Sequence, residues 1–131
     1  MLNRTNLRHI ARARLNDANA LYRSKRYDGA IYLCGYAIEI ILKEGICKTL
    51  RWPGFPSTRK EFENYSSFRT HDLDILLSLS GVEGKIKRKY LAEWYAVAQW
   101  NPEARYKPIG SASDKNALLM IESARTLMRE L

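Results

Sequence analysis

The stretch RYDGAIYLCGYAIEIILKEGICK, from Arg26 to Lys48, decides the fold of this chain. Placed on a helix, at about 100° per residue, its apolar side chains occupy nearly the whole circumference. A helix that is apolar on all sides belongs in the middle of a bundle. Gly29, Gly35 and Gly45 interrupt it, each at a cost of about 1 kcal/mol relative to Ala. Close approach of another backbone or of a ligand would offset that cost.

One polar stripe runs along this helix. Asp28, Tyr32, Tyr36, Glu39 and Lys43 follow one another at three- and four-residue steps, so they line one side. We call these five residues the polar seam. Because unpaired buried charge is costly, the seam must face a partner, a water-filled groove or a ligand. Two interpretations stay open: a ligand-binding surface, and a buried polar network that stabilises the bundle.

The composition indicates one soluble domain, residues 1–131, with 46% hydrophobic and 27% charged residues. No run reaches the roughly 18 uncharged apolar residues that cross a bilayer, and the N-terminus has no apolar signal core. We therefore expect a cytoplasmic protein that does not enter the membrane. The formal net charge of +8 favours an anionic partner, of which nucleic acid and nucleotides are the commonest; a merely basic, soluble surface is the open alternative.

The two cysteines, Cys34 and Cys47, lie 13 residues apart, which is roughly 20 Å along a helix and beyond disulfide reach. Neither of the two histidines stands at metal-ligand spacing from a cysteine. The chain has no Gly-rich phosphate loop, no nucleophile elbow and no HExxH motif. We expect two buried thiols, no metal and no cofactor.

The other segments predict an all-α, up-and-down bundle of about five helices, with no strand. Besides the central helix, the predicted helices cover residues 3–24, Thr70 to Gly81, Lys85 to Gln99, and a last segment capped by Ser113. A long polar loop, residues 52–69, separates the second and third helices. The basic residues from Lys85 to Lys89 would oppose the dipole of the fourth helix, which suggests that they are kept for a partner.

Two features of the first helix bear on function. Arg4, Arg8 and Arg12 form a row at four-residue steps, which suits phosphates but is also typical of a solvated helix face. Arg14 projects within the apolar stripe, and a buried guanidinium would need an acid. Glu39 and Asp17 are the candidate partners.

A resemblance rests on the run RLNDANALYRSKRYDGAIYLCGYAIEIILKEGIC, followed by THDLDILLSLSG and WNPEARY. From about Arg14 to Tyr106 the chain resembles the HEPN domain family of prokaryotic helical proteins. The resemblance implies a helical bundle, a homodimer and nucleotide binding, with a minimal nucleotidyltransferase as partner in a two-gene, toxin–antitoxin-like module. His71-Asp72 matches the family's HDL element, and Glu39 with Lys43 matches its E…LK signature.

The ribonuclease motif of active family members, an Arg and a His about four to six residues apart near the start of a late helix, is not in its expected place. Arg69 stands too close to His71, Arg105 has no His after it, and the pair Arg4 and His9 falls in the wrong helix; these are the three candidates. The resemblance therefore implies RNA or nucleotide binding without catalysis. The alternatives are a metal-independent endoribonuclease, with His71 as general acid/base and Arg69 or Arg105 on the phosphate, and a plain protein-interaction bundle.

These observations combine into one predicted site. Tyr36, Glu39 and Lys43 should open on a groove that four further residues reach: His71, Asp72, Arg105 and Tyr106. Tyr36 and Tyr106 could hold a base between them, and a helix N-terminus near His71 attracts anions. In the rival account Glu39 binds Arg14 inside the core and there is no site. We also expect a homodimer, because about five helices should leave the central helix partly uncovered.

Overall fold

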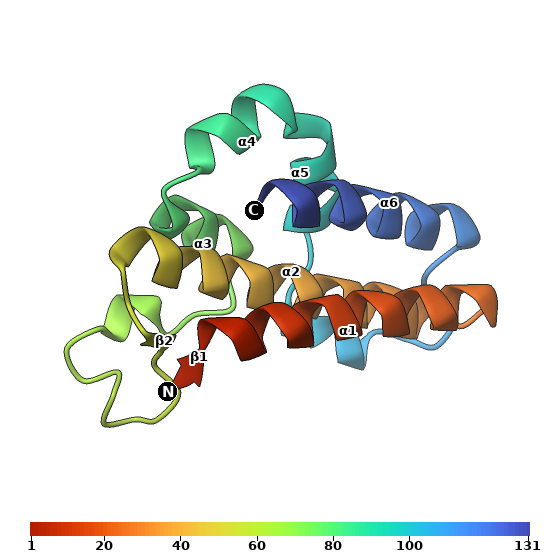
Figure 1. Ribbon diagram of the computed structural model, residues 1–131. Helices are drawn as coiled ribbons and strands as arrows, with labels where there is room; N and C mark the ends of the chain where they lie inside the picture. The colour runs from red at the N-terminus through yellow and green to blue at the C-terminus, as the bar shows by residue number, and fades with distance from the viewer.

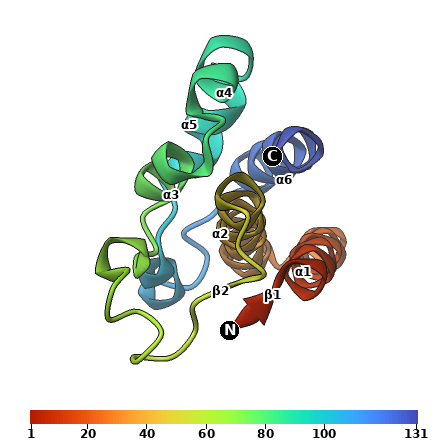
Figure 2. The same ribbon diagram turned by 60° about the vertical axis from the view of Figure 1, so that its left-hand side comes forward.

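The apolar helix is central in the structure, as the sequence predicts. The computed structural model describes residues 1–131, and in it α2 (Tyr27–Leu50) lies among α1 (Arg4–Arg23), α3 (Leu73–Ser80) and α6 (Asp114–Glu130) (Figure 2). Eleven residues of α2 are buried. The all-α bundle is confirmed, and none of its helices combines the length and apolar character needed to cross a bilayer.

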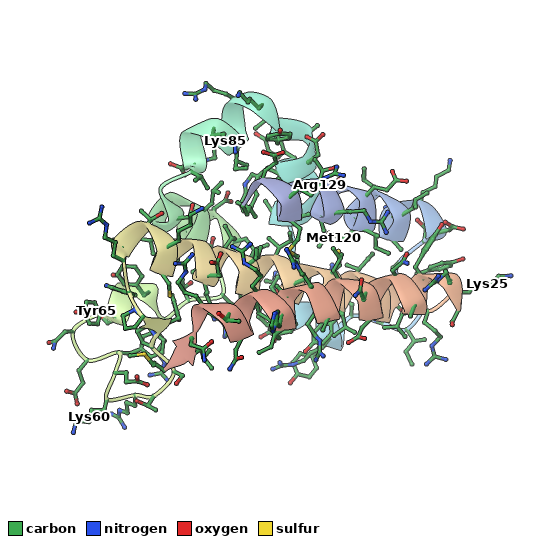
Figure 3. All side chains as sticks on the ribbon, viewed as in Figure 1. Lys25, Lys60, Tyr65, Lys85, Met120 and Arg129 are labelled. Carbon is green, nitrogen blue, oxygen red and sulfur yellow. The ribbon has the colours of Figure 1, made fainter.

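The first two helices form an antiparallel hairpin (Figure 1). Asn3 caps α1 by accepting the backbone N–H of Asn6 at 2.8 Å. At the other end of α1, Lys25 turns the chain with φ at 60°, and its side chain projects from the tip of the hairpin (Figure 3). A two-residue strand, β1 (Leu2–Asn3), pairs antiparallel with β2 (Gly54–Phe55). No strand is expected from the sequence, because two residues are too few to show a strand's alternation.

The last helix runs in the same direction as α2 (Figure 1). Asp114, its first residue, accepts hydrogen bonds from the hydroxyls of Tyr22 at 2.6 Å and Tyr27 at 3.3 Å. Further along, the Cys34 thiol lies 3.5 Å from the carbonyl oxygen of Met120, which lies between α6 and α2 (Figure 3). Successive contacts along both helices thus hold α6 parallel to α2 and antiparallel to α1.

The predicted fourth helix is wrong as a single element. The structure divides it into α4 (Glu83–Lys89) and α5 (Leu91–Ala98), with Tyr90 between them at φ −133° and ψ 35°. Ile86 and Trp94 are both buried, although on one helix they would lie about 12 Å and about 80° apart. The break lets α4 pack on α3 while α5 packs on α6.

This break also overturns the interpretation of the basic cluster. Lys87, Arg88 and Lys89 form the last turn of α4 rather than the first turns of a long helix. Cations at a helix C-terminus interact favourably with its dipole. These charges are therefore locally stabilising, and they give no indication of a partner.

The start of the third helix differs by two residues from the prediction. Asp72, and not Thr70, caps α3, because its carboxylate accepts the backbone N–H of Ile75 at 3.1 Å. The Thr70 hydroxyl instead accepts the backbone N–H of Asp72 at 3.0 Å. The helix ends at Gly81, with φ at 83°, as predicted. Ser113 caps α6 as predicted.

The long loop is anchored to the main hydrophobic core by its aromatic side chains. Its aromatic rings are Trp52, Phe55, Phe62, Tyr65 and Phe68. The ring of Trp52 lies 5.0 Å from those of Tyr65 and Phe68, measured between centroids. A 3-10 turn, η1 (Ser66–Phe68), closes the loop, which also carries Lys60 and Tyr65 at the edge of the molecule (Figure 3).

The bundle covers its central helix more completely than expected. Leu50 is the only large apolar residue of α2 that is exposed. The expectation that α2 would be partly uncovered, on which the predicted homodimer rested, is therefore wrong. The homodimer itself stays a prediction. One reason for the close covering is Trp100, which follows α5 and lies against Gly35, where a Cβ atom would overlap its ring.

A pair of glycine substitutions tests this packing. We expect Gly35→Ala to lower the free energy of unfolding by about 1–3 kcal/mol, because the added Cβ must displace Trp100. Gly45→Ala is the matched control on the same helix, where a Cβ meets nothing within 4 Å, and should raise stability by up to about 1 kcal/mol. Urea denaturation measures both changes. Equal effects of the two substitutions would contradict the placement of Trp100.

Candidate functional site

Glu39 is the centre of the downstream half of the seam. Its side chain is only 4% exposed, yet both of its oxygens have a cationic or imidazole partner. Lys43, one turn further along α2, places Nζ 3.1 Å from Oε2. His71, just before α3, places Nδ1 2.8 Å from Oε1. A buried carboxylate needs such partners, and here one comes from α2 and one from another segment.

The local sequence explains why these partners meet. Lys43 also lies over the ring of Phe55, 5.3 Å from its centroid, so β2 holds the long side chain in place. His71 precedes the cap residue Asp72, so the start of α3 fixes its position. Its side chain remains 60% exposed although Nδ1 is engaged. The other ring nitrogen is therefore the one available to a ligand.

The rival account, in which Glu39 binds Arg14 in the core, is wrong. Arg14 places Nε 3.2 Å from Oδ2 of Asp17, three residues along the same helix. Both side chains are about half exposed, so this pair forms without burying either charge. Glu39 is left to Lys43 and His71.

The upstream half of the seam is aromatic. The ring of Tyr36 lies 5.1 Å from that of Tyr32 and 4.9 Å from that of Trp100, both edge to face. Burial raises the pKa of the Tyr36 hydroxyl, and a hydrogen bond with Tyr32 raises it further. Glu39 and Arg105 also act on this pKa, Glu39 upward and Arg105 downward, so Tyr36 connects the two halves of the seam.

Arg105 and Tyr106 reach this half from the 3-10 turn η2 (Pro102–Tyr106), which packs on α2. The guanidinium of Arg105 lies 4.8 Å from the ring centroid of Tyr106. Side-chain contacts with the hydroxyls of Tyr106 and Tyr32 raise the pKa of Arg105, which keeps its charge at every physiological pH. Tyr106 is 71% exposed and offers an open ring face.

Two predicted contributors have structural roles instead. Asp28 accepts the backbone N–H groups of Gly110 at 2.6 Å and Ala112 at 2.9 Å, and these bonds lower its pKa. It therefore fixes the loop before α6. One carboxylate oxygen of Asp72 caps α3 by accepting the backbone N–H of Ile75. Asp28 belongs to the seam by spacing but does not face a ligand surface there.

The remaining predicted residues form a strip along α2 and the segments beside it. From Tyr32 to Lys43 the seam extends about 16 Å along α2. Two cavities, of about 320 and 290 Å³, lie elsewhere. None of the seven residues predicted to bind a ligand lines either cavity: Tyr36, Glu39, Lys43, His71, Asp72, Arg105 and Tyr106. An extended ligand fits such a strip better than a compact one.

Sequence reasoning missed a second buried acid. Glu44 has a side chain that is 2% exposed, and its Oε1 accepts hydrogen bonds from Arg4 at 2.9 Å and Arg8 at 3.1 Å. Two members of the predicted phosphate row on α1 thus share one acid as partner, although both side chains remain 41% exposed. The available signal was the position of Glu44 on the apolar side of α2, where an acid requires a cation from a neighbouring helix.

The thiols and the metal-binding groups offer no chemistry at this strip. Cys34 and Cys47 are free and buried, and burial raises their pKa values to about 12 and about 11. Nowhere do three His, Cys, Asp or Glu side chains gather as a metal site would require. Comparisons with protein-family models, with curated proteins and with solved structures find no match to this chain.

The Glu39 cluster leads to a stability prediction. Lys43→Met keeps the apolar stem over Phe55 but leaves the buried carboxylate with His71 alone, so we expect a loss of roughly 1–3 kcal/mol. Lys48→Met, on the exposed side of the same helix and without an ion pair, should change stability by no more than about 0.5 kcal/mol. Urea denaturation compares the two. A loss no larger for Lys43→Met than for the control would show that the cluster does not stabilise the fold.

Proposed function

We propose that this chain is a HEPN-like, non-catalytic protein that binds RNA or a nucleotide along the polar seam. It acts as a homodimer, in a two-gene module with a small nucleotidyltransferase. The observation that carries the proposal is one end of the strip, where the exposed ring of Tyr106 and the guanidinium of Arg105, which forms no ion pair, lie together beside the half-buried rings of Tyr32 and Tyr36. Proteins that bind single-stranded nucleic acid without strong sequence preference combine these two kinds of group, rings for bases and cations for phosphates.

The charge distribution supports an anionic ligand. Six of the 22 Lys and Arg residues form ion pairs with carboxylates, and the other sixteen do not. Several carboxylates accept internal hydrogen bonds. Asp28 accepts from a loop, Asp72 from the first turn of α3, and Asp74 from the indole N–H of Trp94. Hydrogen bonds from neutral groups leave these carboxylates charged, so the sign of the field outside the molecule follows from the net charge of +8.

RNA binding is tested with a single-stranded oligonucleotide of about ten nucleotides, within the usual site size of such proteins. We expect Arg105→Ala and Tyr106→Ala each to weaken binding by about 1–3 kcal/mol, because one removes a phosphate contact and the other a stacking surface. Fluorescence anisotropy at several salt concentrations measures the affinity. Arg105→Ala should also reduce the salt dependence, by about 0.7 in the logarithmic slope.

Controls separate binding from folding. Both side chains are exposed, so melting temperatures should stay close to that of the wild type. Arg12→Ala, an exposed cation on α1, should leave the affinity nearly unchanged. If the wild-type protein binds neither the oligonucleotide nor AMP, the chain is an interaction bundle, and the seam is structural only.

A second function, metal-independent ribonuclease, is favoured by the orientation of His71. Glu39 holds Nδ1 at 2.8 Å, and the exposed side of the ring presents Nε2 to solvent. A buried carboxylate that fixes an imidazole in this way is one half of a general acid/base arrangement. Arg105 or Arg69 would then contact the phosphate.

Incubation of RNA with substoichiometric protein in the presence of a chelator decides between the two functions. We expect the RNA to remain intact, because no Arg-His pair with the required spacing stands at the strip. Cleavage that His71→Ala abolishes and His9→Ala leaves in place would establish the ribonuclease instead. His9 is the matched control, because it is exposed on α1.

Exposed apolar side chains support the homodimer. Of the twelve large apolar residues that are exposed, four lie on α5 and α6, two helices that pack on each other: Leu91, Tyr95, Leu118 and Leu119. Apolar surface concentrated in this way is typical of protein contacts. The nucleotidyltransferase partner is proposed on the resemblance alone.

A further inference from the structure

The cavity of about 320 Å³ lies between α2, α5, α6 and the loop that joins the last two helices. Its size is at the lower end of small-molecule sites, which range over about 300–1,000 Å³. Apolar side chains form one part of its wall: Ile31, Ala96, Trp100, Ala104, Leu119 and Met120. Asp28 is the one residue of the polar seam that lines this cavity, and none of the seven residues predicted to bind a ligand does.

The polar part of the wall consists mainly of hydrogen-bond donors. Asn101 uses its side-chain oxygen to accept the N–H of Glu103, and Asn116 uses its own to accept from Ser113. Each is therefore left with an amide NH₂ group that has no acceptor. Lys107 adds an ammonium that forms no ion pair. Gln99 and the hydroxyl of Ser111 are the other side chains here that carry both a donor and an acceptor.

The one carboxylate in the wall already has several hydrogen-bond donors. The oxygens of Asp28 accept backbone N–H groups from Gly110 and Ala112, and the Ser111 hydroxyl also hydrogen-bonds this carboxylate. The wall contains one more donor without an acceptor. The indole N–H of Trp100, a residue 94% buried, has no hydrogen-bond partner. A buried donor without an acceptor costs about 1–3 kcal/mol, and a structure seldom retains one without a reason.

We infer that this cavity binds a small molecule with an apolar body and an oxyanion head. The body would lie against Ile31, Leu119 and Met120. The head would accept hydrogen bonds from the amide groups of Asn101 and Asn116 and pair with Lys107. The excess of donors over acceptors selects an anionic or strongly accepting head, and the apolar wall selects against a sugar or a free inorganic anion.

Three probes with the same tail test the inference: octanoate, octyl phosphate and octanol, each below its aggregation concentration. Titration into the ¹⁵N-labelled protein, followed by ¹H–¹⁵N spectra, gives both the affinity and the place of binding. We expect shifts in residues 99–112 and 116–120 and in the indole N–H of Trp100. Octanol should bind at least about tenfold more weakly than the oxyanions, which corresponds to about 1.4 kcal/mol for the charged head. The two oxyanions distinguish a carboxylate from a phosphate head.

Matched variants localise the site. Leu119→Trp should fill the cavity and abolish binding, whereas Leu118→Trp, next to it but outside the cavity, should not. Lys107→Gln should weaken octanoate and octyl phosphate about tenfold and leave octanol unchanged. Lys115→Gln removes an exposed ammonium outside the cavity and serves as its control. All four replaced side chains are exposed, so the variants should fold. The same spectra check that they do.

Several results would overturn the inference. Shifts centred on the other cavity, around Trp52 and Tyr65, would place binding elsewhere. Equal affinity for octanol and the oxyanions would show that the ligand needs no oxyanion head. Binding of AMP with shifts in residues 99–112, and no response to octanoate, would show that the cavity takes a nucleotide and not a ligand with an apolar body. Arg105→Ala, which tests the seam, should leave octanoate affinity unchanged, so failure of the RNA proposal and failure of this one are distinguishable.

Discussion

Two buried carboxylates on one apolar helix constrain the rest of the structure. Glu39 and Glu44 lie five residues apart on α2 and are almost fully buried. Each can stay charged there only because cations or an imidazole reach it. For Glu44 these come from α1, through Arg4 and Arg8. For Glu39 one comes from the segment before α3, through His71. The charges on α2 thus determine where its neighbours must lie.

Much of the fold could be predicted because it depends on regular patterns. The helical period of the apolar residues predicts α1, α2 and α6, and Asn3, Gly81 and Ser113 mark ends that the structure confirms. The break at Tyr90 could not be predicted. It contains neither Pro nor Gly, and it lets α4 pack on α3 while α5 packs on α6. Such tertiary demands override local propensity.

The sequence predicts which residues belong to the candidate site better than it predicts the shape of that site. Helical spacing places Tyr36, Glu39 and Lys43 on one side, and the structure brings His71 to Glu39 and Arg105 near Tyr36. Spacing within one helix cannot show how far other segments fold over it, so the shape of the surface around these residues could not be predicted. The cavity beside Trp100 escaped prediction for the same reason, since four separate segments form its wall.

The parallel course of α6 has a consequence for the order of folding. The hydroxyl of Tyr22 and the carboxylate of Asp114 meet across 92 residues of sequence, whereas α1 and α2 meet across a three-residue turn. Contacts between distant residues require closure of a large loop and form late, and hairpin contacts form early. The α1–α2 hairpin therefore assembles first with one flank of α2 bare, and Cys34 stays accessible until α6 docks. A nascent chain on the ribosome carries that apolar flank uncovered until its last helix has emerged.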